Sequence, residues 1–100
     1  TPELKQSYLR ELRRTTAPGY SWETRQNALA MLHQVGALNL ENVRDLMQAT
    51  EHHSWQFRKF SRSLLEEVVA KTPEAADWSE LASSFSKEKY SYLYQLIEDL

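Results

Sequence analysis

Apolar residues recur three and four positions apart along most of this chain, and short polar breaks separate the apolar segments. Residues at these spacings share one face of an α-helix, so the pattern predicts amphipathic helices. The longest stripe runs through Phe57, Phe60, Leu64 and Val68. Six helical segments are expected in all, and their stripes begin at Leu4, Ala28, Leu40, Phe57, Trp78 and Tyr90.

Helix caps mark the start of each segment. Ser, Thr and Asn accept hydrogen bonds from the free N–H groups of a first helical turn. The expected caps are Thr1, Ser21, Asn39, Ser54, Thr72 and Ser86. Pro2 and Pro73 each follow one of these caps, where Pro suits the start of a helix. Gly36 stands where the second segment ends, and Pro18-Gly19 marks the first loop.

The breaks between segments are short, and none has the length of a linker. Short connections place successive helices side by side in opposite directions. We therefore expect one all-α domain over residues 1–100, built from six short-to-medium helices stacked as antiparallel pairs. The chain opens on the cap residue Thr1 rather than on Met, so we expect it to be a piece of a longer protein.

Part of the chain repeats at an offset of 33 residues, the distance from Ser21 to Ser54. The matched pairs are Ser21 and Ser54, Trp22 and Trp55, Arg25 and Arg58, Leu32 and Leu65, Val35 and Val68, Ala37 and Ala70, Glu41 and Glu74, and Ala49 and Ala82. The pattern predicts helix-pair repeats at about residues 21–50 and 54–85. Two amphipathic helices of similar length could share Ser, Leu and Val by chance, whereas the Trp and Arg matches favour the repeat.

The repeat has the features of an α-solenoid. Each copy opens with Trp-x-x-Arg, at Trp22 to Arg25 and at Trp55 to Arg58, and continues with a stripe of Leu and Val. In this the chain resembles HEAT and armadillo repeats, although neither copy has the Pro that HEAT repeats usually carry in the first helix. The resemblance implies an α–α superhelix that serves as a scaffold for a partner.

A weaker resemblance, carried by residues 53–65 and the last helical segment, is to the C-terminal helical-repeat region of M1-type zinc aminopeptidases. It implies a non-catalytic accessory domain that packs on a catalytic domain, in which case the parent protein would be a metallopeptidase. The alternative to an accessory domain is that the same helical architecture forms an independent protein-interaction module.

Composition removes several kinds of chemistry. The chain has no Cys, which excludes disulfides and thiolate sites, and its two Gly residues cannot form a phosphate-binding loop. His33, His52 and His53 lack the His-Glu-x-x-His spacing of a zinc helix. No apolar run is long enough to span a membrane. We therefore expect no catalytic residue, no metal and no cofactor in these residues, and no membrane partner.

Charged and aromatic residues suggest where a partner would bind. Arg10, Arg13 and Arg14 cluster in the first segment, and Arg58, Lys59 and Arg62 in the fourth. A nucleic-acid-binding helical repeat would use such clusters, but the net charge of −2 favours an ordinary solvated face and a protein or peptide partner.

The aromatic residues divide into expected core and expected surface. Trp22 and Trp55 hold equivalent places in the repeat and are expected to be buried between helices. Tyr92 and Tyr94 cannot both join the last apolar stripe, because residues two apart on a helix point in different directions. At least one of these two tyrosines should be exposed or should meet a partner. The expected partner-binding residues are Arg10, Arg13, Arg14, Arg58, Arg62, Tyr92 and Tyr94.

Overall fold

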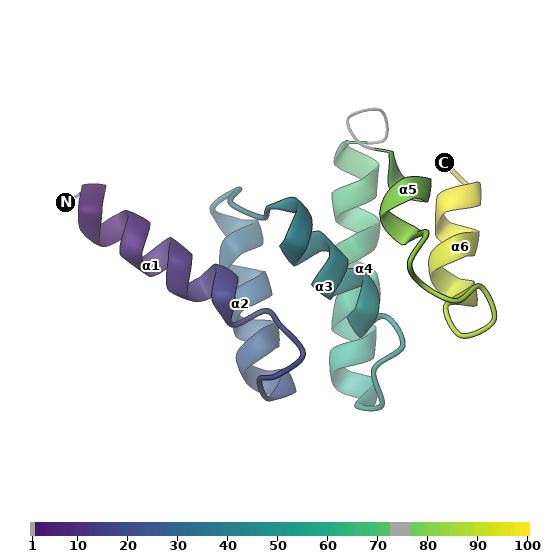
Figure 1. Cartoon of the computed structure of the whole chain (residues 1–100), viewed down its shortest axis with the longest axis horizontal. Helices are drawn as coiled ribbons and strands as arrows, with labels where there is room; N and C mark the ends of the chain where they lie inside the picture. The colour runs from purple at the N-terminus through teal and green to yellow at the C-terminus, as the bar shows by residue number, and fades with distance from the viewer. Residues whose placement is uncertain (1, 73–76) are drawn as a thin grey trace. The chain divides into compact units, whose positions relative to one another are not determined.

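The structure is a computed structural model that describes residues 2–72 and 77–100. Within these residues the regular secondary structure is entirely α-helical, which confirms the all-α class (Figure 1). The helices are α1 (Pro2–Arg14), α2 (Trp22–Gln34), α3 (Leu40–Ala49), α4 (Trp55–Lys71), α5 (Trp78–Ala82) and α6 (Ser91–Glu98). All six segments expected from the apolar pattern are therefore present as helices.

The helices belong to two compact units, Thr1–Leu46 and Met47–Leu100. The division falls inside α3, so the first turns of this helix belong to the first unit and its last residues to the second. Each unit holds its own set of packed helices and its own polar network.

In the first unit, α1 and α2 pack as an antiparallel pair (Figure 1). Their shared core consists of Leu9, Leu12, Ala28 and Leu32. The apolar stripe of α1 was expected to begin at Leu4, but Leu4 and Tyr8 are exposed. Only the C-terminal half of α1 meets the apolar face of α2, so the same stripe is buried at one end and open at the other.

The end of α2 is fixed by Gly36. Its φ of +68° lies in the left-handed region that glycine adopts without steric cost. The Gly36 N–H donates to the carbonyl of His33, and the Ala37 N–H donates to that of Leu32 over 2.8 Å. This Schellman motif satisfies carbonyls that the last helical turn leaves free, and it turns Ala37 and Leu38 back onto the core.

Three of the five expected caps that the structure describes lie where the sequence placed them. Ser21 accepts a hydrogen bond from the Thr24 N–H, and Asn39 accepts one from the Asn42 N–H. Ser54 occupies the N-cap position of α4, although its hydroxyl makes no capping bond.

Two caps differ from expectation, and one cap lies outside the described residues. Thr72 ends α4, and Asp77 caps α5 through the Glu80 N–H. The Ser86 hydroxyl accepts from the Lys89 N–H as a cap would, and its carbonyl accepts from the Tyr90 N–H, but these bonds close a turn before α6, and that helix begins only at Ser91. Thr1, Pro73 and Glu74 lie outside the described residues.

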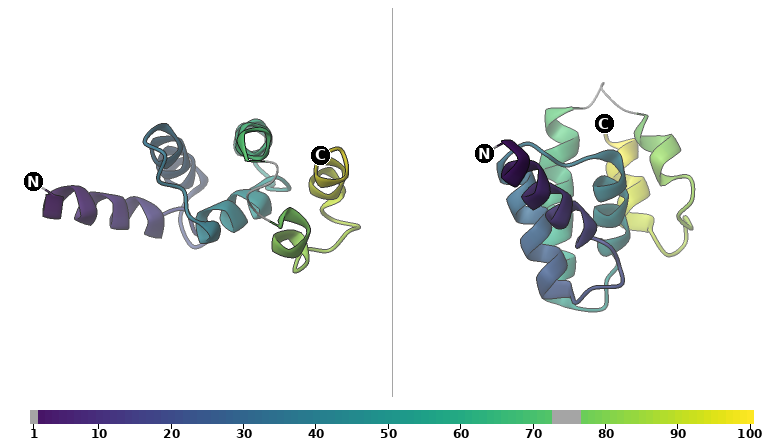
Figure 2. Two further views of the ribbon diagram at one scale, coloured as in Figure 1. Left: turned by 90° about the horizontal axis from the view of Figure 1, so that it is seen from above. Right: turned by 60° about the vertical axis from the view of Figure 1, so that its left-hand side comes forward.

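In the second unit, α5 and α6 pack as an antiparallel pair, and α4 and α6 are both seen nearly end-on in the left view of Figure 2. The buried apolar side chains of these three helices are Phe57, Leu64, Leu65, Val69, Trp78, Ala82 and Leu93. Tyr94 fastens α6 to the end of α5, because its hydroxyl donates to the carbonyls of Ala82 and Phe85, each over 2.8 Å.

Substitution of Gly36 tests the Schellman motif at the end of α2. Gly36→Ala should lower the free energy of unfolding by about 1 kcal/mol, because a Cβ disfavours left-handed backbone. Gly19→Ala is the matched control: its φ is not left-handed and nothing lies within 4 Å of its added Cβ. Urea unfolding should place this control within about 0.5 kcal/mol of the parent chain. Equal effects at both glycines would contradict the Schellman assignment.

Candidate functional site

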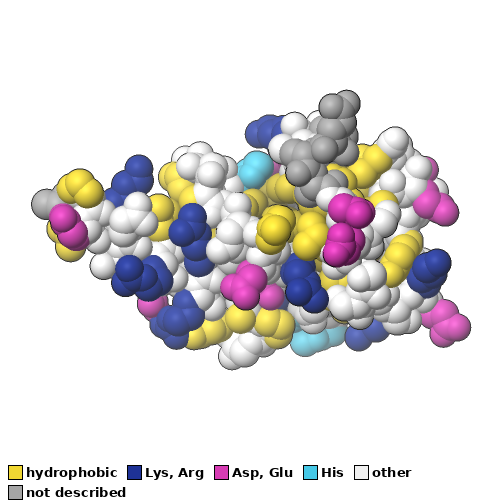
Figure 3. Space-filling model, turned by 45° about the horizontal axis from the view of Figure 1, so that its top comes forward, with side chains coloured by type: hydrophobic (Ala, Val, Ile, Leu, Met, Phe, Trp, Pro, Cys, Tyr) yellow, Lys and Arg dark blue, Asp and Glu magenta, His cyan; other side chains and the backbone are white. Residues whose placement is uncertain are grey.

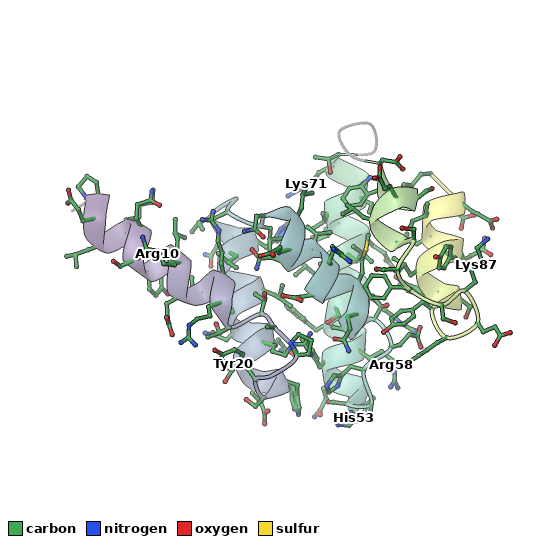
Figure 4. The ribbon with its side chains drawn as sticks, viewed as in Figure 1. Arg10, Tyr20, His53, Arg58, Lys71 and Lys87 are labelled. Atoms are coloured by element: carbon green, nitrogen blue, oxygen red, sulfur yellow. The ribbon has the colours of Figure 1, made fainter. Side chains whose placement is uncertain are left out.

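The arginines of α1 have mainly local partners. Arg13 donates through Nε to the carbonyl of Ala37 over 3.1 Å, which ties α1 to the loop after α2. Arg14 pairs with Glu11, and it also donates to the hydroxyl of Tyr20. Arg10 is exposed on α1 (Figure 4). Figure 3 shows Lys and Arg side chains spread along the part of the molecule that α1 occupies. The first Arg cluster is thus divided between structural contacts and solvent.

A buried polar network joins the helices of the first unit around Arg25, which is only 1% exposed. Arg25 donates through Nε to the carbonyl of Thr16 over 2.9 Å and through Nη2 to the carbonyl of Asp45 over 3.3 Å. The Thr16 hydroxyl donates to the Asp45 carboxylate over 2.7 Å, and the Asn42 amide donates to that same hydroxyl. Because its members hydrogen-bond to one another, the network is a structural connection.

Burial also alters the acid–base properties of this network. Desolvation lowers the pKa of Arg25, and the nearby Asp45 carboxylate partly offsets that effect. Desolvation raises the pKa of Asp45, while the hydrogen bond from Thr16 and the charge of Arg25 act in the opposite direction. Perturbed titrating pairs are common at functional sites, and structural ion-pair networks also perturb pKa values.

The second unit contains an open groove of about 280 Å³ between α4 and α6. We call it the α4–α6 groove, and its lining residues are Trp55, Arg58, Lys59, Arg62, Ser63, Glu66 and Tyr92. Six of the seven come from one side of α4, where residues three, four and seven apart align. Arg58 lies near the N-terminal end of α4, and Lys71 lies at the opposite end (Figure 4).

A stacked pair of side chains fixes one wall of the groove. The guanidinium carbon of Arg62 lies 4.4 Å from the ring centroid of Tyr92. Arg62 also pairs through Nη2 with Glu51 at 2.8 Å and donates through Nε to the carbonyl of Thr50 over 2.9 Å. The Tyr92 hydroxyl donates to the carboxylate of Glu66. Burial, together with that bond, raises the pKa of Tyr92.

The opposite end of the groove is open and cationic. The Trp55 side chain is 62% exposed at the start of α4, and Lys59 is also exposed. Arg58 donates through Nη1 to the carbonyl of His52 over 2.8 Å, and no carboxylate of the described residues pairs with it. The groove therefore joins an indole surface to two cations that no described carboxylate neutralises.

The structure brings together only part of the surface expected from the sequence. Arg58, Arg62 and Tyr92 line one groove, whereas Tyr94 points to the end of α5. The part of this expectation that concerns exposure was wrong, because neither tyrosine is fully exposed, whereas contact of one of them with a partner stays a prediction. Both are half-buried, and both hydroxyls donate to groups of this chain.

The expectation for the second tryptophan was also wrong, because Trp55 is exposed rather than wedged between helices, while Trp22 is half-buried. Trp55, Lys59, Ser63 and Glu66 are groove residues that were not among the expected partner-binding residues. A usable signal was present: Trp55, Arg58, Lys59 and Arg62 follow at helical spacing, so the indole had to share a face with the cations.

In the described part of the chain, neither a metal site nor a membrane-spanning helix is present. No three of its His, Asp and Glu side chains are grouped so as to hold a metal ion. His52 and His53 lie in the turn before α4 with their rings stacked 4.2 Å apart. None of the described helices is both long enough and apolar enough to cross a membrane.

These observations define an all-α protein with a cationic and aromatic groove on its second unit. Comparison of the chain with known protein families, curated proteins and solved structures finds no match.

Arg25 and Arg58, which stand 33 residues apart at matching positions of the sequence, should differ in their contribution to stability. Arg25→Ala leaves two carbonyls and the Asp45 carboxylate without their buried cation, and should cost about 3 kcal/mol or more. Arg58→Ala removes one hydrogen bond from a half-buried side chain and should cost about 1 kcal/mol. Urea unfolding of both variants measures the difference. Equal costs would show that burial of the guanidinium is not what distinguishes them.

The raised pKa of Asp45 predicts a pH effect with a definite sign. The folded state binds this proton more tightly than the unfolded state, where the pKa is about 3.9. Stability contributed by protonated Asp45 is present below that pKa and is lost as the pH rises through the folded-state value. The unfolding free energy of the parent chain minus that of Asp45→Asn should therefore fall as the pH rises from below about 3.9 through the folded-state pKa. A difference that rises over this interval would contradict the assignment.

Proposed function

We propose that this chain is a non-catalytic helical-repeat scaffold that binds a protein partner, or a neighbouring domain of its own protein, through the α4–α6 groove. The observation that carries the proposal is the exposed indole of Trp55 beside Arg58 and Lys59. Trp, Tyr and Arg are the residues most enriched among those that dominate binding energy at protein interfaces. The groove contains all three.

The positions of the matched residues support the repeat. Trp22 and Trp55 are the first residues of α2 and α4, and Ala49 and Ala82 are the buried last residues of α3 and α5.

The two matched arginines, Arg25 and Arg58, make comparable hydrogen bonds. Arg25 and Arg58 each donate to a carbonyl in the loop that precedes their own helix, at Thr16 and at His52. Stacked helix pairs of this kind present extended surfaces to partners.

The groove is also held in place before a partner arrives. Arg62 is fixed by Glu51, by the Thr50 carbonyl and by the ring of Tyr92, and Tyr92 is in turn fixed by Glu66. Side chains that are already ordered lose less conformational entropy when they bind. This arrangement suits a binding surface, either on an accessory domain beside a catalytic domain, as the M1 aminopeptidase resemblance implies, or on an independent interaction module.

Photo-crosslinking at the groove tests the proposal. A benzophenone amino acid in place of Ser63 lies in the groove, and the same amino acid in place of the exposed Ser79 on α5 is the control. Ser63 labelling should give a crosslinked protein that Ser79 labelling does not. That partner, once purified, should bind the unlabelled chain, and Trp55→Ala should weaken binding at least tenfold, as expected for a central interface tryptophan.

Leu40→Ala is the matched control for this substitution, since Leu40 is a similarly exposed apolar residue in the first unit. It should leave the affinity unchanged, and circular dichroism should show the same helical melt for both variants. A purified partner that binds the Trp55→Ala chain as tightly as the parent would contradict the proposed surface.

A further inference from the structure

We infer that the occupant of the α4–α6 groove is a short acidic peptide segment in extended conformation, with an apolar side chain on Trp55 and carboxylates at Arg58 and Lys59. The inference rests on the proposed function and specifies its ligand. It follows from the charges of the groove, from their order along α4 and from the length of the lined surface.

The charges of the groove do not cancel. Arg62 is neutralised by Glu51 at 2.8 Å, and Glu66 accepts the hydroxyl of Tyr92. Among the residues that the structure describes, Arg58 binds only a neutral carbonyl, that of His52, and it keeps further N–H groups for another acceptor. Lys59 is exposed, and no ion pair to it is found in the described part of the chain. The two cations near Trp55 therefore attract an anion, while the carboxylate of Glu66 repels one.

The order of these groups gives the ligand a direction. Trp55 lies at one end, Arg58 and Lys59 come one turn later, and Ser63 and Glu66 lie at the far end. Acidic side chains of the ligand should lie near its apolar anchor, and neutral polar side chains should lie beside Ser63 and Glu66. From Trp55 to Glu66 the helix rises about 16 Å, which is the span of about five extended residues.

Carboxylates fit this arrangement better than phosphate. Consecutive residues on a helix diverge by about 100°, so Arg58 and Lys59 suit two separate carboxylates rather than one shared phosphate. A nucleic acid is disfavoured because DNA-binding proteins commonly neutralise about 6–10 phosphates. The groove offers two free cations on a chain of net charge −2.

The test uses defined peptides and the indole N–H signal of Trp55 in ¹H–¹⁵N NMR spectra, assigned with Trp55→Phe. The probe is acetyl-Phe-Asp-Glu-Ser-Gly-amide, and its neutral match is acetyl-Phe-Asn-Gln-Ser-Gly-amide. The acidic peptide should shift the Trp55 signal with saturation and bind at least fivefold more tightly than the neutral one. The buried indole of Trp78 should not respond.

Charge variants identify the cations responsible. The double variant Arg58→Gln/Lys59→Gln should reduce the affinity for the acidic peptide to that for the neutral peptide. Lys5→Gln/Lys71→Gln removes the same charge from exposed residues outside the groove and should leave the affinity unchanged. Equal binding of the two peptides would overturn the inference. So would tighter binding by a twelve-residue oligothymidylate or by a phosphoserine peptide.

The two proposals fail in different ways. A crosslinked partner that loses affinity in Trp55→Ala but not in Arg58→Gln/Lys59→Gln would refute the acidic ligand and support the groove as the binding surface. A partner indifferent to Trp55→Ala would refute the proposed function itself.

Discussion

Hydrogen bonds from arginine side chains to the carbonyls of loops and helix ends hold this small helical protein together. The last four carbonyls of a helix have no partner within that helix. Arg25 donates to Thr16, beyond the end of α1, and Arg62 donates to Thr50, beyond the end of α3. Arg13 donates to Ala37, beyond the end of α2. In a chain without disulfides, a guanidinium group links one helix to the loop that follows another.

The number of donors on a guanidinium explains how one arginine can make a structural hydrogen bond and still bind a partner. A guanidinium has five N–H donors in a planar fork, so a bond to one carbonyl leaves others for a second acceptor. Arg25 is buried and directs two of its donors to carbonyls inside the unit. Arg58 makes the comparable bond to His52 from a half-buried position and keeps donors exposed to the groove. Burial thus distinguishes Arg25, whose role is structural, from Arg58, which is suited to binding.

The spacing of apolar residues predicted all six helices, because it depends only on residues within each helix. Caps such as Ser21 and Asn39 were predictable for the same reason, since a cap acts within one turn. The exposure of Leu4 and Trp55 was not predictable: periodicity says which residues share a face, but not how far a neighbouring helix covers that face.

The groove was predictable only in part, because spacing within one helix does not reveal which side chains a second helix contributes. Its cations follow from helical spacing along α4, but Tyr92 reaches them from α6, 30 residues further along the chain from Arg62. The bonds from Tyr94 to the end of α5 likewise depend on how two helices pack.

The network around Arg25 also has a consequence for the order in which the protein takes shape during synthesis. The helix pair α1 and α2 is joined by a short loop and is complete once residue 34 has left the ribosome. Its arginine then has the Thr16 carbonyl but still lacks Asp45, which is made later. Until α3 emerges, the nascent pair lacks one of the two carbonyls that Arg25 binds and the carboxylate beside it. The arrival of Asp45 removes that deficit, so completion of the first unit is coupled to the synthesis of its third helix.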